Sequence, residues 1–186
     1  MAWAFKYSSL SAIRRTLLAF GLLWTVVASF PVMAADPWPS ASGPVHDGAN
    51  WSKRKAAGGD YSGHVLKNIN FSGADLRGAN FDGADISQVN LMNANLAGAS
   101  FRGARLTGVN LIKTDLTDSD FTDAVLDNVN MTGVTLRDAC FDGTTLNMIN
   151  MNDAMIDGAA FVAPTIGMIV PMGLLDGIAV ADCLGG

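Results

Sequence analysis

The chain has 186 residues, of which 49 % are hydrophobic, and its formal net charge is −5. This length allows one domain with its own core. The acidic balance argues against direct nucleic-acid binding, which requires a basic patch. Every acidic residue is aspartate, which forms local hydrogen bonds in turns more readily than glutamate does, so the aspartates indicate many turns.

Residues 1–35 are typical of an export signal. The pair Arg14-Arg15 precedes an apolar run over residues 16–30, and a small-residue cleavage site ends at Ala34. We expect cleavage there or after Ala35, and export to a periplasm, or to the thylakoid lumen if the source is photosynthetic. The general secretory route and the twin-arginine route both stay open. An uncleaved membrane anchor is the alternative, because the apolar run approaches the roughly 20 residues that cross a bilayer.

Residues 36–58 are rich in proline, glycine, serine and charge, and are predicted to form a linker and an N-terminal cap. Trp51 is in register with the repeat that follows, so we expect its ring to lie over the first coil. The basic run Lys53-Arg54-Lys55 is predicted to interrupt the pattern. Cleavage of the signal leaves nine basic residues and seventeen aspartates, a net charge of −8.

Residues 59–166 contain a five-residue repeat. A large apolar residue occupies every fifth position from Tyr61 to Ile166, which makes 22 consecutive steps, and a small or β-branched residue such as Ala74 or Ala79 stands two positions before each step. A period of five fits neither a helix nor a strand. A fixed repeat of this length indicates a solenoid, in which each unit buries its apolar face against its neighbours.

The outward positions of the repeat predict a corner in every pentapeptide. Two residues after the steps, 17 of 21 sites hold glycine, asparagine or aspartate, which tolerate the positive φ of a tight turn. Each pentapeptide is therefore predicted to be a short extended side followed by a corner. The exceptions Gln88, Lys113, Met148 and Ala163 predict another turn type at their corners.

A second period of twenty residues predicts four corners in each coil. Asparagines recur every twenty residues from Asn70 to Asn150, and aromatic residues recur likewise from Tyr61 to Phe161. We expect the aromatic rings to form an internal column and the asparagines an outward ladder of amide hydrogen bonds. The repeat then forms about 5.5 coils with parallel strand pairing. Three inward hydroxyls need backbone partners: Thr114, Ser119 and Thr144.

The pentapeptides Ala74–Gly78, Ala79–Gly83 and Ala94–Gly98 resemble the motif Ala-(Asp/Asn)-(Leu/Phe)-X-X of the pentapeptide-repeat family. The resemblance covers somewhat more than half of the chain. It implies an all-β fold, a right-handed quadrilateral parallel β-helix whose step residue, and the residue two before it, point inward.

Residues 167–186 are apolar without the period of five. An open solenoid end exposes core and unpaired backbone, so a short C-terminal helical cap is predicted, beginning at Pro171. Met148 and Met155 point outward by register. We expect this tail to cover them, or a second copy to do so in a homodimer through an end cap.

Cys140 and Cys183 are the two cysteines of the chain. An even count in an exported protein predicts a disulfide, which closes a loop of about 40 residues and is worth roughly 4 kcal/mol in the loop-entropy model. Two free thiols are the alternative.

The sequence gives no candidate catalytic, cofactor-binding or metal-binding residues. His46 and His64 have no cysteine, glutamate or second histidine at ligand spacing, and the methionine group 148, 151 and 155 is broken by the inward register of Met151. No nucleophile–base pair or phosphate-binding glycine loop stands out.

We therefore predict an exported, non-enzymatic structural or protein-interaction module with an unidentified protein partner, which binds neither nucleic acid nor, after signal cleavage, a membrane. The family resemblance implies an alternative, because some members mimic duplex DNA and bind type II topoisomerases. Export argues against that alternative, since those enzymes stay in the cytoplasm. An enzyme is the third reading, and it requires a pocket deeper than this narrow core offers.

Overall fold

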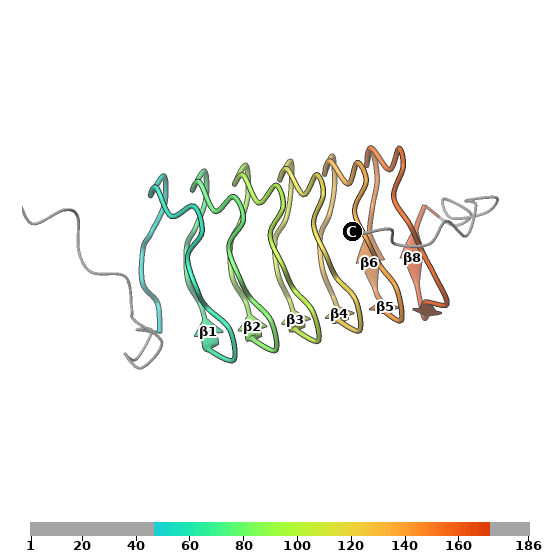
Figure 1. The fold of residues 1–186 in the computed structure, drawn as a ribbon, viewed down its shortest axis with the longest axis horizontal. Coiled ribbons are helices and arrows are strands. Elements are labelled where there is room, and N and C mark those ends of the chain that lie inside the picture. Colours follow the sequence, from blue (N-terminus) through green and yellow to red (C-terminus); the bar gives the residue numbers. More distant parts are fainter. Residues whose placement is uncertain (1–46, 172–186) are drawn as a thin grey trace, which may run out of the picture. The chain divides into compact units, whose positions relative to one another are not determined.

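The computed structural model describes residues 47–171, which form a four-sided parallel β-solenoid (Figure 1). Residues of one coil pair with the residues twenty positions later, as in the bridge Asn70↔Asn90. A corner with positive φ occurs at every fifth residue from Gly48 to Ala163. Four corners in each twenty-residue coil confirm the predicted quadrilateral β-helix.

The strands are short, because each side of a coil has room for only two or three extended residues between corners. They are β1 (Val65–Lys67), β2 (Asp85–Ser87), β3 (Arg105–Thr107), β4 (Val125–Asp127), β5 (Thr145–Asn147), β6 (Ile149–Asn150), β7 (Thr165–Ile166) and β8 (Ile169–Val170). Strands β1 to β5 and β7 form a six-stranded sheet in chain order, and β6 pairs with β8. The helix predicted from Pro171 onward lies outside residues 47–171, and within that range no helix could span a membrane.

The coils stack into four walls, each named for the first residue of its pairing column. The column of the Asn50 wall is Asn50, Asn70, Asn90, Asn110, Asn130, Asn150 and Val170. The column of the Lys55 wall is Lys55, Asp75, Asn95, Asp115, Thr135 and Met155. The column of the Asp60 wall is Asp60, Asn80, Ser100, Asp120, Cys140 and Ala160. The Val65 wall consists of β1 to β5 and β7. Two corners separate the Asn50 wall from the Asp60 wall, so these two lie on opposite sides of the coils.

The stacked coils begin earlier than the predicted repeat start at Gly59. Pairing starts at Asn50, and Lys55 bridges to Asp75. Lys53 has a φ of 56° and forms an ordinary corner. The basic run therefore does not interrupt the pattern, because its outward side chains leave the backbone free to pair with the next coil.

The prediction of another turn type is wrong at Lys113, whose corner is closed by the usual hydrogen bond, from the N–H of Thr114 to the carbonyl of Leu111 at 3.1 Å. It is confirmed at Gln88, Met148 and Ala163, whose corners lack the equivalent bond. The φ angles are 53° at Gln88, 54° at Lys113, 52° at Met148 and 45° at Ala163, as at the other corners. Such a conformation costs a residue with a Cβ about 1–2 kcal/mol. The hydrogen bonds between coils offset this cost, as in the bond from the N–H of Gln88 to the carbonyl of Thr107 at 2.9 Å.

The predicted aromatic column is confirmed. Ring centroids lie 4.8 Å apart for Phe81 and Phe101 and 4.7 Å apart for Phe101 and Phe121, with the planes within 4° and 1° of parallel. This spacing equals the distance between paired strands. The rings therefore stack because the backbone places equivalent residues directly over one another.

The three inward hydroxyls have the backbone partners that the sequence requires. Thr114 donates from Oγ1 to the carbonyl of Leu91 at 2.8 Å. Ser119 donates from Oγ to the carbonyl of Leu116 at 2.6 Å. Thr144 donates from Oγ1 to the carbonyl of Phe121 at 2.8 Å. Each bond supplies a partner for a polar group that would otherwise be costly to bury.

Trp51 closes the N-terminal side of the core as predicted. Its ring packs edge-on against Phe71, with centroids 5.3 Å apart and an interplanar angle of 74°. The guanidinium of Arg54 lies 5.6 Å from the centre of the indole ring, within the range of a cation–π contact.

Candidate interaction surfaces

The asparagines of the Asn50 wall bind their own corners rather than one another. Oδ1 of Asn110 accepts a hydrogen bond from the backbone N–H of Ile112 at 3.1 Å, and Oδ1 of Asn70 accepts one from Ser72 at 3.0 Å. Within residues 47–171, a single amide–amide bond joins two coils of this column, from Nδ2 of Asn90 to Oδ1 of Asn70 at 3.4 Å. The predicted ladder is therefore wrong, because the N–H two residues ahead is the nearer donor.

Aspartates make the same local bond on the other walls. Oδ1 of Asp60 accepts from the N–H of Ser62 at 3.0 Å, and Oδ1 of Asp120 accepts from the N–H of Thr122 at 2.8 Å. The asparagine or aspartate just before the step thus has a structural role on the Asn50, Lys55 and Asp60 walls. Recognition of a partner is better sought at the other two outward positions of the pentapeptide.

Negative charge is concentrated on the Asp60 wall. Its outward charged residues are Arg102 and the aspartates Asp60, Asp82, Asp120, Asp123 and Asp142. Those of the opposite Asn50 wall are Lys53, Lys113 and Asp153. On the Lys55 wall they are Lys55, Arg77, Arg137, Asp75, Asp115, Asp118, Asp138 and Asp157, and on the Val65 wall Lys67, Arg105, Asp47, Asp85 and Asp127. The Asp60 wall therefore has the largest excess of acid, five to one.

The Asp60 wall remains negative despite one ion pair. Nη1 of Arg102 lies 2.6 Å from Oδ2 of Asp120, with both side chains partly exposed. Burial raises the pKa of Asp120, but hydrogen bonds from Thr122 and Arg102 outweigh this and place the pKa below its ordinary value. The backbone hydrogen bond from Ser62 likewise lowers the pKa of Asp60. Both carboxylates are ionised at neutral pH.

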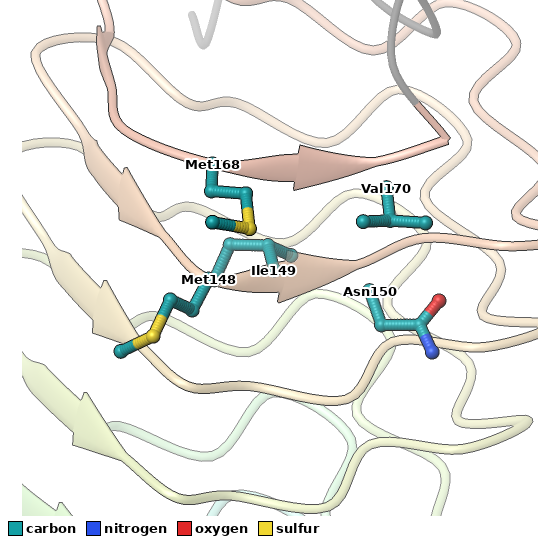
Figure 2. Close-up of a pocket in the computed structure, with 5 residues that line it drawn as sticks. All are labelled: Met148, Ile149, Asn150, Met168 and Val170. Atoms are coloured by element: carbon teal, nitrogen blue, oxygen red, sulfur yellow. The ribbon is translucent and has the colours of Figure 1, made fainter.

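An apolar patch lies at the C-terminal end of the described chain. Met148, Ile149, Asn150, Met168 and Val170 line a shallow pocket of about 270 Å³ (Figure 2). Met148 is 46 % exposed and Met168 is 57 % exposed. These side chains have no polar group suited to chemistry apart from the Asn150 amide, so the pocket favours apolar packing.

Two predicted features fall partly or wholly outside the described residues. Cys140 lies on the Asp60 wall with Sγ 3.5 Å from Oγ1 of Thr122, whereas Cys183 lies outside residues 47–171, so the disulfide stays a prediction. The signal over residues 1–35 also lies outside them.

His64 is partly buried, and its Nδ1 lies 3.0 Å from the carbonyl oxygen of Ser62. In the part of the chain that the structure describes, no group of three or more histidine, cysteine or acidic side chains is placed to hold a metal ion.

The separation of charge between opposite walls was not predicted from the sequence. Net charge gives the total and not the wall on which each aspartate lies. The period of twenty contains the signal that predicts this separation. Asp82 and Asp142 are sixty residues apart, which is three coils, and Asp123 follows the step Phe121 of the same wall, so all three belong to one wall.

A family model described as Pentapeptide repeats matches the chain in eight copies over residues 62–91, 86–123 and 111–147. No curated protein matches the chain in sequence.

Solved structures of similar chains include a pentapeptide repeat protein, Rfr23, from the cyanobacterium Cyanothece 51142, which is 20 % identical over 60 % of this chain and 83 % of its own, with a TM-score of 0.42. Full-length QnrB1, a plasmid-mediated fluoroquinolone resistance protein, is 18 % identical over 63 % of this chain and 65 % of its own, with a TM-score of 0.40. A pentapeptide repeat protein from the thylakoid lumen of Arabidopsis thaliana is 34 % identical over 61 % of this chain and 69 % of its own, with a TM-score of 0.21.

Proposed function

The chain belongs to the pentapeptide-repeat family, and from this premise we propose that it is an exported, non-enzymatic interaction module whose Asp60 wall binds a protein partner with a basic surface. The excess of aspartate on one wall of an otherwise uniform solenoid carries the proposal. Opposite walls share corner geometry and coil spacing, so the scaffold alone does not require this difference.

Three carboxylates of the Asp60 wall are suited to this role. Asp82, Asp123 and Asp142 stand after the step residues. Oδ1 of Asp82 accepts hydrogen bonds from Oγ of Ser100 and from the corner N–H of Arg102 in the next coil, whereas Asp123 and Asp142 make no such corner bond within residues 47–171. Asp123 and Asp142 lie on adjacent coils, about 4.8 Å apart along the stack, and Asp82 lies two coils before Asp123. An ordered set of like charges attracts a basic partner and fixes its orientation.

Export is the second part of the proposal and rests on residues 1–35. The basic pair and apolar run of that segment are typical of a signal, and the proposed destination is a periplasm or the thylakoid lumen. Fractionation tests it: recovery of the mature chain from the exported fraction supports export. Recovery from the cytoplasm with Met1 intact overturns it, and favours the DNA-mimicking alternative.

Affinity capture tests the role of the wall. The bait is the exported chain, compared with a triple variant carrying Asp82→Asn, Asp123→Asn and Asp142→Asn. Asparagine keeps the shape of each side chain and tolerates the positive φ of 59° at Asp123. We expect the variant to lose a partner that wild type captures at low salt, with the captured partner carrying a basic surface.

A matched control removes three aspartates elsewhere. The variant Asp85→Asn, Asp127→Asn and Asp153→Asn changes net charge by the same amount, with its substitutions on the Val65 and Asn50 walls. It should capture the partner as wild type does. Equal loss in both variants would show that total charge, and not the Asp60 wall, governs binding.

A further inference from the structure

We propose that residues 172–186 of the same chain cover the C-terminal end of the solenoid, crossing from the Asn50 wall to the Asp60 wall, where Cys183 forms a disulfide with Cys140. The proposal depends on export only for the oxidising compartment. The segment proposed to cover the C-terminal end is therefore residues 172–186 of the same chain. A second copy at the same end is the competing outcome of the test.

The last described coil has an inward-register residue, Ile166, that is not packed beneath a further coil. In the inward column of the Val65 wall, Leu126 and Leu146 are each 0 % exposed, whereas Ile166 at the end of the same column is 48 % exposed. A buried isoleucine contributes about 1.5–3 kcal/mol more than an exposed one, so covering Ile166 is favourable. The N-terminal end differs, since Trp51 packs there on Phe71.

The apolar patch extends this uncovered surface around the corner. Figure 2 shows Val170 on β8 and Met168 directly before β8, with Ile149 and Asn150 on the neighbouring strand β6 and Met148 beside them. Val170 is 42 % exposed. The patch is therefore continuous with the last coil at the point where the described chain ends.

The tail starts beside the patch and has the composition to cover it. Pro171 directly follows β8, and the next residues include Leu174, Leu175 and Ile178. Three apolar side chains within five residues are unfavourable in water and favourable against an apolar surface. This adjacency favours the tail over a second copy, since the tail needs no association to reach the patch.

The position of Cys140 sets the direction of the tail. Cys140 lies on the wall opposite Pro171 and pairs with Ala160 of the coil above, so one coil separates it from the end. Facing walls are about 10 Å apart and adjacent coils about 4.8 Å. The twelve steps from Pro171 to Cys183 extend up to about 40 Å, which exceeds the distance across the end. The shortest path passes over the last coil.

The bond forms by thiol–disulfide exchange. The two thiols lose two protons and two electrons, Sγ joins Sγ, and a small-molecule or protein disulfide oxidant is reduced to two thiols. Exported compartments supply such oxidants. Reduction reverses the reaction and releases the tail from its distal attachment.

Hydrogen exchange and thiol counting test the proposal together. The full-length chain is purified from whichever fraction accumulates it, treated with oxidised glutathione, and alkylated without reductant. We expect no alkylated cysteine, a monomer by light scattering, and amides of residues 165–170 that exchange at least tenfold more slowly than in the variant Leu174→Asp/Leu175→Asp. Cys183→Ser should also speed this exchange.

The control variant Gly185→Asp/Gly186→Asp adds the same charge beyond Cys183 and should retain the protection. Two alkylated thiols, or equal exchange in wild type and Leu174→Asp/Leu175→Asp, would overturn the proposal. Protection that appears only with dimer formation would assign the end to a second copy, which also overturns it. A chain retained in the cytoplasm that still gives the expected result after oxidation would contradict export alone.

Discussion

The Asn50 wall and the Asp60 wall are opposite sides of the same coils, and they differ in charge while sharing their backbone. Both have corners with φ near 60°, as at Lys113 and Gly103, and both bind a corner N–H through the residue before the step. Their outward charges are nevertheless two lysines and one aspartate on the first, and five aspartates and one arginine on the second. The comparison shows that the solenoid constrains the residue before the step and the corner residue, while the charge of the outward side chains still differs from wall to wall.

The largest expected effect concerns the core that the two walls share. Phe101 lies behind the Asp60 wall and Leu111 behind the Asn50 wall of the same coil, and both are 0 % exposed. Phe101→Ala should cost about 3–5 kcal/mol and Leu111→Ala about 2–5 kcal/mol of unfolding free energy. Urea unfolding measures both. A cost under about 1 kcal/mol for either would mean that the wall in front of it does not depend on the stacked core.

The corner bonds should have equal weight on the two walls. Asn110→Ala and Asp120→Ala each remove an acceptor for a corner N–H and should cost about 0.5–2 kcal/mol, as at comparable side-chain caps. The controls Asn110→Asp and Asp120→Asn keep Oδ1 and should cost less. If the alanine variant and its control on one wall have the same free energy of unfolding, that wall does not depend on this bond.

Corner substitutions should have opposite signs on the two walls. Gly103 has a φ of 61° with nothing within 4 Å of an added Cβ, so Gly103→Ala should cost about 1 kcal/mol through backbone strain alone. Lys113 already bears that strain at a φ of 54°, so Lys113→Gly should stabilise by up to about 0.5 kcal/mol. Thermal unfolding of the two variants checks the signs.

The smallest expected effect is a local response to acid that occurs on the Asp60 wall and not on the Asn50 wall. The pKa values of Asp60 and Asp120 are lowered from the ordinary 3.8, so their ionised forms stabilise the fold above that pH, and the stabilisation is lost as the pH falls through the lower folded values. Amide NMR shifts of Ser62 and Thr122 should therefore move between pH 5 and pH 2.

Asparagine does not titrate, so the amides of Ser72 and Ile112 on the Asn50 wall serve as the control. They should remain unchanged over the same pH range. Parallel movement of all four amides would indicate unfolding of the whole solenoid instead of local protonation.

The sequence predicted most of the fold because its signals repeat. Residues twenty apart fill the same place in each coil, so the column through Phe101 followed from register. The inward positions of Thr114 and Thr144 likewise predicted that these hydroxyls have backbone partners, which the structure then identifies. The positive φ at Gln88 and Lys113 could not be predicted from residue type, since the energy that holds these corners comes from neighbouring coils. Local propensity is overridden where stacking fixes the backbone.

The candidate site was harder to predict than the fold. Asn70 and Asn90 suggested a ladder by their spacing, but the choice between an amide in the next coil and an N–H two residues ahead depends on side-chain geometry. The acidic wall depends on which coil positions carry charge, and composition averages over them. Exposure of Met148 was expected from register, whereas the pocket with Met168 required the position of the last coil.

Carboxylate footprinting of the complex tests directly whether the partner binds the Asp60 wall. The chain is labelled with a carbodiimide and an amine, free and bound to its captured partner, and labelling at each aspartate is measured by mass spectrometry. We expect the partner to protect Asp82, Asp123 and Asp142 and to leave Asp85, Asp127 and Asp153 as reactive as in the free chain. Protection of the second set with full labelling of the first would contradict this expectation.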